Sequence, residues 1–126
     1  MMGQKFTVYG EMPSMNKIVA ASKSHWGGYS KLKGEFTELV VNSSQGLDRM
    51  ESVAVQCDWY AKDRRTDPDN IAAGVKFILD GLVASNVLDN DGWGQISGII
   101  HTFNVDKDSP RVEITLREAG PNERQD

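Results

Sequence analysis

Strict alternation of apolar and polar residues marks several segments of this chain as β-strands. The clearest alternation runs through residues 51–61, shorter ones fill residues 5–10 and 111–118, and residues 95–105 are also predicted to form a strand. A period of two is the spacing of side chains on one face of a strand. Residues 107–110, Lys-Asp-Ser-Pro, have turn composition, so the last two strands are predicted to form an antiparallel hairpin.

Two other segments show helical periodicity. Residues 29–44 carry apolar side chains at helical spacing and end before the helix-stopping Gly46. Residues 67–85 predict a second helix with one apolar side, whereas residues 11–28, which contain Pro13 and Gly27-Gly28, predict a loop. The apolar residues of the two helices are Leu32, Phe36, Leu39 and Val40 in the first, and Ile71, Val75, Ile78, Leu79 and Leu82 in the second.

The element order is therefore β-α-β-α-β-β, which predicts an α/β (α+β) fold. We expect a single small domain over residues 1–120, with one mixed sheet and about two helices packed on it. Residues 121–126 are polar and predict a C-terminal tail.

The composition narrows the possible classes of protein. The chain has 126 residues, 39% hydrophobic and 25% charged, as in an ordinary globular domain. No apolar run approaches the ~20 residues of a membrane span, and the first residues lack the apolar core of a signal peptide. Cys57 is the single cysteine, which excludes an intrachain disulfide and a cysteine-rich zinc site. We therefore expect a cytoplasmic protein without a membrane partner.

Charge is segregated along the chain. The net charge is −4, which argues against nonspecific nucleic-acid binding by the whole surface. Residues 12–34, however, contain four lysines and no acidic residue, so this segment carries +4 and the rest of the chain −8. A protein that contacts both phosphates and divalent cations would have this distribution, although a solvated lysine-rich loop would have it too.

The most informative stretch is acidic. Asp67 and Asp69 lie at a predicted helix start, and Asp89 and Asp91 lie in a loop after that helix. Carboxylates from separate segments are the ligands that Mg²⁺ and Mn²⁺ prefer, and phosphodiester cleavage uses such sites. The alternative is structural: Asp67 caps the helix before Pro68, Asp69 complements the helix dipole, and residues 89–92 form a solvated turn.

The predicted helix places a lysine beside these carboxylates. Lys76 falls in the same polar stripe as Asp69 and Asp80, opposite the apolar side. There it can meet a phosphate near a metal, or it can form an i,i+4 ion pair with Asp80.

These motifs, in this order, resemble the RusA family of Holliday-junction resolvases. The resemblance rests on Asp67-Pro68-Asp69-Asn70, then Lys76, Asp80-Gly81-Leu82 and Leu88-Asp89-Asn90-Asp91. Pro13-Ser14-Met15-Asn16 after the first strand and Arg64-Arg65 before the aspartate pair are similar to the family's pattern as well. No single piece is specific, but the ordered combination spans most of the chain.

The resemblance implies a homodimeric, metal-dependent endonuclease that cuts four-way DNA junctions in recombination and repair, often phage-encoded. It implies Asp67, Asp69 and Asp91 as catalytic ligands of Mg²⁺ or Mn²⁺, with Asp89 as the alternative third carboxylate and Lys76 as the essential lysine. In the family the lysine follows the second aspartate by four residues, a position that Ala73 occupies here. The residues expected to contact DNA phosphates are Lys17, Lys23, Lys31, Lys33, Arg64 and Arg65.

Three other functions remain open at this point. The scaffold can serve a nuclease of different branched-DNA specificity, a noncatalytic branched-DNA-binding protein, or a metal-binding regulatory domain without DNA. Trp26 and Tyr29 are either base-stacking residues or packing aromatics. His101 and Cys57 lie within predicted strands and are expected to be structural.

Overall fold

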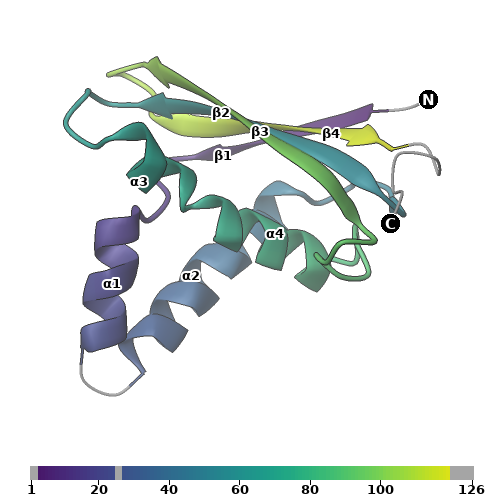
Figure 1. The fold of residues 1–126 in the computed structure, drawn as a ribbon, viewed down its shortest axis with the longest axis horizontal. Helices are drawn as coiled ribbons and strands as arrows, with labels where there is room; N and C mark the ends of the chain where they lie inside the picture. The colour runs from purple at the N-terminus through teal and green to yellow at the C-terminus, as the bar shows by residue number, and fades with distance from the viewer. Residues whose placement is uncertain (1–2, 25–26, 120–126) are drawn as a thin grey trace.

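Four strands form one mixed sheet, with all the helices on one of its faces (Figure 1). The computed structural model describes residues 3–24 and 27–119. The strands are β1 (Gly3–Tyr9), β2 (Val53–Ala61), β3 (Ile96–Val105) and β4 (Arg111–Glu118), in the order β1-β4-β2-β3. β4 pairs antiparallel with β1 and β2, and β2 pairs parallel with β3. The predicted α+β class, its four strands and its mixed sheet are confirmed.

The predicted hairpin between the last two strands is wrong. β3 and β4 run antiparallel, but they lie on opposite sides of β2 and do not pair with each other. The short connection between them passes the end of β2, where the Asp106 N–H donates to the Ala61 carbonyl at 2.8 Å. Arg111 secures this connection through its 2.8 Å ion pair with Asp106. The turn composition was interpreted correctly, but a turn does not determine which strands become neighbours.

The helices are α1 (Met15–Lys23), α2 (Gly28–Ser43), α3 (Pro68–Ala72) and α4 (Val75–Ala84). α2 matches its prediction, whereas α1 occupies a segment that was predicted as a loop. Ser14 caps α1 by accepting a hydrogen bond from the Lys17 N–H. Its side chains are half-exposed or exposed throughout, although Met15, Ile18 and Val19 stand at helical spacing, so the loop prediction is wrong.

The predicted helix over residues 67–85 is two helices. α3 ends at Ala72, and α4 begins at Val75 after Gly74. A Cβ at Gly74 would lie 3.0 Å from both Met12 Cβ and the Trp59 ring, so glycine permits the chain to approach the sheet closely here.

The core lies between the helix layer and the sheet. Every second residue of β2 from Val53 to Trp59 is buried, as the alternation predicts. α4 contributes Ile78, Leu79 and Leu82, also as predicted. The opposite face of the sheet is uncovered and polar. The tail predicted at residues 121–126 lies outside the described residues. Among the described residues, no helix has both the length and the apolar character needed to span a membrane.

Candidate metal and DNA site

Asp67 and Asp69 lie at the start of α3, just beyond the end of β2. Asp67 occupies the N-cap position, with Pro68 as the first helical residue, but its carboxylate makes no capping hydrogen bond. The Asp67 carbonyl instead accepts hydrogen bonds from the N–H groups of Asn70 and Ile71, at 3.0 and 3.1 Å. Asp69 Oδ1 accepts from the Asn70 N–H at 2.9 Å. Both side chains are exposed, so the carboxylate of Asp67 is not consumed by the capping role.

Basic side chains lie on the segments next to this position. Arg64 and Arg65 are exposed in the loop between β2 and α3, and Arg65 Nε lies 3.7 Å from Asp63 Oδ2. α1 contacts α3, which brings the first turn of α1, with the exposed Lys17, toward the same end of the sheet. Arg64 and Arg65 therefore lie on the loop that leads into the aspartate pair, and Lys17 lies on the helix that contacts α3.

The other predicted DNA-binding lysines lie farther along the two N-terminal helices. Lys23 ends α1 and Lys31 lies in the first turn of α2, both exposed. α1 and the start of α2 extend away from the sheet, whereas the end of α2 packs against α4 (Figure 1). Lys33 lies 4.0 Å from Asp80 Oδ2, which ties α2 to α4.

Lys76 is exposed in the first turn of α4. Because the chain breaks at Gly74, Lys76 and Asp69 belong to different helices and do not share one continuous stripe. The alternative ion pair of Lys76 with Asp80 is not formed within the described residues, where Lys33 is the basic partner of Asp80. The Lys76 ammonium is thus exposed to solvent and accessible to a phosphate.

Asp89 and Asp91 lie in the loop that leads from α4 to β3. Asp89 is engaged by Arg49, whose Nε donates to Oδ1 at 3.2 Å and whose Nη2 pairs with Oδ2. That hydrogen bond is the main cause of the raised pKa of Arg49. Asp91 is exposed and makes no recorded ion pair among the described residues. Of the two carboxylates, Asp91 is the one that is free to bind a ligand.

The structure does not bring the two pairs of aspartates together within one chain. β2 and β3 are parallel, so the connecting helices run from the end of β2 back to the start of β3. Asp67 and Asp69 therefore lie at one end of the sheet and Asp91 at the other, on the order of 25 Å apart for a strand of this length. Within residues 3–24 and 27–119, no group of three or more acidic, histidine or cysteine residues could hold a metal ion. Two carboxylates alone do not complete the predicted magnesium site.

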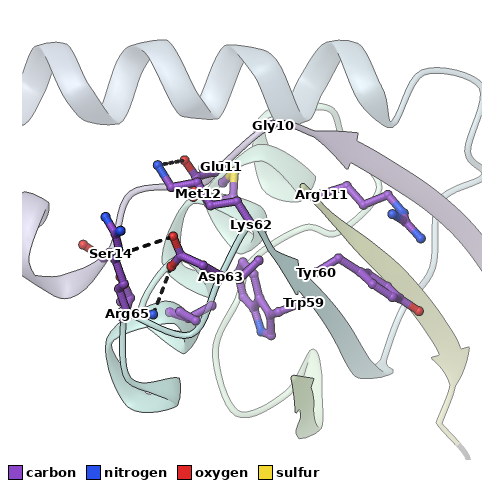
Figure 2. A pocket seen from close by; sticks show the side chains of 13 residues that line it. Gly10, Glu11, Met12, Ser14, Trp59, Tyr60, Lys62, Asp63, Arg65 and Arg111 are labelled. Carbon is purple, nitrogen blue, oxygen red and sulfur yellow. Dashed lines mark hydrogen bonds and ion pairs between the residues drawn. The ribbon is translucent and has the colours of Figure 1, made fainter. Parts of the chain in front are cut away.

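A cavity of about 260 Å³ lies at the end of β2, and its lining reaches Thr66, the residue before Asp67 (Figure 2). It is bounded by the loop after β1, the end of β2 and the loop into α3. Met12, Trp59 and Ile71 supply apolar lining, and Ser14, Arg65 and Thr66 supply polar groups.

The charged side chains around this cavity are paired with one another. Lys62 Nζ lies 3.6 Å from Glu11 Oε1, and Arg65 pairs with Asp63. Arg111, on the far side, lies 3.9 Å from the centre of the Tyr60 ring and pairs with Asp106 and Glu113. The cavity therefore suits a largely uncharged group.

Sequence reasoning missed this cavity and the aromatic contact beneath it. Trp59 Nε1 donates to His101 Nδ1 at 2.8 Å, which links β2 to β3 and confirms a structural role for His101. Burial raises the pKa of the Cys57 thiol to about 12, so Cys57 is a core residue rather than a nucleophile, as predicted. Tyr29 is half-buried on α2. His25 and Trp26 lie outside the described residues. The cavity has no sequence signal, because its walls come from segments far apart in the chain.

Comparison with models of known protein families and with curated proteins finds no match to this chain.

Proposed function

We propose that this protein is a homodimeric, magnesium- or manganese-dependent endonuclease that cleaves branched DNA, a Holliday-junction resolvase of the RusA type. The observation that carries the proposal is the exposed Asp67–Asp69 pair. The Asp67 carboxylate makes no capping hydrogen bond, and the exposed Arg64 and Arg65 lie just before the pair in the chain. The ordered RusA-like motifs along the sequence support the same function.

The edge strand β3 supports a dimer. It is the last strand of the sheet, so one side of its backbone has no strand partner among residues 3–24 and 27–119. Ile99, Phe103 and Val105 share the helix-covered face with Val55 and Trp59, yet they are 41%, 41% and 48% exposed. The apolar residues of the inner strands are buried beneath α2 and α4, whereas Ile99, Phe103 and Val105 on the edge strand stay exposed. A long, apolar, unpaired edge is a surface on which another strand adds.

The β3 strand of a second copy of the chain can pair with this edge, and that pairing also completes the set of carboxylates. A two-fold axis makes two identical edge strands antiparallel. The start of one β3 then lies beside the end of the other. This places Asp91 of one protomer near Asp67 and Asp69 of its partner, once at each end of the seam. The separation found within one chain thus becomes proximity between two chains.

A divalent cation held by these carboxylates would supply Lewis-acid polarisation of a phosphodiester. Lys17, Arg64 and Arg65 would hold the DNA backbone on either side of the cut, and Lys76 would neutralise developing negative charge. The cavity beside Asp67 would accommodate part of a neighbouring nucleotide. Two sites related by the dimer axis would cut two strands of a four-way junction symmetrically.

The first experiment compares a synthetic four-way junction with a linear duplex of the same sequence, with and without Mg²⁺ or Mn²⁺. We expect paired symmetric cuts in the junction that require metal. Asp69→Asn is expected to abolish cleavage while keeping junction binding, because it removes charge and not volume. Cleavage by this variant at the wild-type rate would refute the site.

Mixed dimers test the shared site directly. Asp69→Asn and Asp91→Asn chains are each expected to be inactive alone. If ligands come from both protomers, a mixed dimer contains one site with both changes and one intact site. Mixing and re-equilibrating the two variants should restore single-strand nicking to roughly a quarter of the wild-type level for random assortment. No recovery would mean that each site lies within one chain.

The alternative is a noncatalytic branched-DNA-binding protein on the same fold. The incomplete carboxylate group in one chain and the net charge of −4 favour it. Specific junction binding without cuts under any metal condition would establish that alternative.

A further inference from the structure

Trp93 is the most exposed of the large apolar side chains in the described part of the chain. Its side chain is 96% exposed, against 67% for Tyr9, the next in order. A tryptophan whose side chain stays fully in water lacks the favourable free energy that burial of its large apolar surface would contribute. Such a side chain on a surface indicates a contact that forms with a ligand.

The exposure follows from an ordered turn. The N–H groups of Gln95 and Ile96 both donate to the Gly92 carbonyl, at 3.1 and 3.0 Å. Trp93 lies at the tip of this closed turn, with Gly92 and Gly94 on either side. Neither glycine has a side chain to cover the indole, so both faces of the ring are open.

The surroundings of Trp93 indicate the kind of ligand. The side chains of Asn90 and Gln95 lie beside Gly92, and Asp91 precedes the turn, so the immediate surroundings of the indole are polar. A single flat ring with open faces is sufficient to stack on one nucleobase. Bases inside an intact duplex are already stacked on both sides, whereas bases at a branch point, gap or single strand are accessible.

Resting on the proposed function, we propose that Trp93 stacks on an unpaired nucleobase at the branch of the DNA substrate and thereby selects branched over linear DNA. The turn follows Asp91 directly and leads into β3, so in the proposed dimer the indole lies beside the shared carboxylate site. A branch-point base would be held next to the phosphate that is cut.

Charge makes this contact depend on metal. Asp91 next to the turn repels phosphates, and Asp89 is offset by Arg49. A divalent cation held by Asp91 in the proposed dimer would remove that repulsion. Stacking should therefore be stronger with a divalent cation present than in its absence.

The test uses the full-length protein and a four-way junction carrying 2-aminopurine at the branch point, with Ca²⁺ in place of Mg²⁺ and the DNA checked for integrity. Calcium takes the same oxygen ligands. Binding of wild type should quench the 2-aminopurine fluorescence. Trp93→Ala should remove this quenching and weaken junction binding about tenfold, with linear duplex binding changed less than about twofold. Trp93→Phe should restore most of both effects.

Tyr9→Ala is the matched control, since it removes another exposed aromatic ring at the opposite edge of the sheet. Unchanged quenching and junction affinity in Trp93→Ala would overturn the inference. A shift of Trp93→Ala from dimer to monomer in sedimentation would overturn it as well, because the ring would then contact the partner chain.

The readout is separate from cleavage. Metal-dependent junction cutting by a Trp93→Ala variant that binds and quenches like wild type would leave the nuclease standing and remove this role for Trp93. Trp93-dependent stacking by a wild-type protein that never cuts DNA would refute the nuclease alone. No DNA binding by wild type would refute both.

Discussion

The indole Nε1 of Trp59 donates a hydrogen bond to Nδ1 of His101 at 2.8 Å, joining the central strand β2 to the edge strand β3. The His101 ring also stacks on Phe103, with 6.2 Å between ring centres and 20° between planes. Because Nδ1 accepts this bond, His101 must be neutral with its proton on Nε2. The strand proposed to form the dimer seam thus depends on an uncharged histidine.

This arrangement predicts a loss of stability on acidification. Burial lowers the pKa of His101, so the unfolded chain binds its proton more readily than the folded chain. The contribution of His101 is complete above its unfolded pKa of about 6.5 and is lost as the pH falls from there through the lowered pKa. Denaturant unfolding between pH 8 and pH 5 should show this decline. His101→Gln should flatten it, and an unchanged pH profile in that variant would assign the decline to other groups.

Helices α2 and α4 touch at Gly81 and Val40. A Cβ at Gly81 would lie 2.3 Å from Val40 Cγ1 and 2.4 Å from Val40 Cβ. Gly81→Ala should therefore lower the free energy of unfolding by about 1–3 kcal/mol, measured by denaturant titration.

The control for this change is Gly34→Ala, within α2. A Cβ there meets nothing within 4 Å, so the helix should gain about 0.5–1 kcal/mol. Equal effects of the two substitutions would mean that the α2–α4 contact has room for a methyl group at Gly81.

Phe103 tests the dimer seam. Phe103→Glu places a charge on the exposed apolar edge of β3 and should convert the dimer to a monomer in sedimentation equilibrium, with junction cleavage lost in parallel. Tyr9→Glu, at the opposite edge strand, should leave the assembly unchanged. A Phe103→Glu protein that stays dimeric would place the interface elsewhere.

Substitution of Asp89 and substitution of Asp91, which lie in the same loop, should have very different effects on the cleavage rate. Asp91→Asn is expected to abolish cleavage. Asp89→Asn should leave the rate within about threefold of wild type, because Arg49 already engages that carboxylate and the exposed pair contributes little. The reverse ranking in a junction-cleavage assay would make Asp89 the third ligand.

Lys76→Ala should reduce the cleavage rate by at least about tenfold, with junction affinity nearly unchanged, because the lysine is expected to act on developing charge. Lys76→Arg keeps the positive charge and should retain most of the rate. Single-turnover kinetics separates this effect from binding. A rate unaffected by Lys76→Ala would make this lysine an ordinary solvated side chain.

The hydrophobic pattern along the chain was sufficient to predict several helices and strands. The alternation at Val53, Val55, Cys57 and Trp59 identifies β2 and its buried face, and period 3.6 identifies the apolar sides of α2 and α4. α1 was missed because Pro13 and Gly27-Gly28 indicate a loop, although Met15, Ile18 and Val19 between them stand at helical spacing. The break at Gly74 was missed because it depends on close contact with Met12 and Trp59, two residues from other segments.

The sequence by itself determined which residue types are present for metal and phosphate chemistry and which short segments carry them, because these are local properties of the chain. The tertiary structure decided where they lie. The parallel pairing of β2 and β3 places Asp67 and Asp69 at one end of the sheet and Asp91 at the other, since a crossover must return to the starting end. Strand neighbours are a nonlocal choice, set by which apolar faces can be buried together, and no spacing along the chain encodes it.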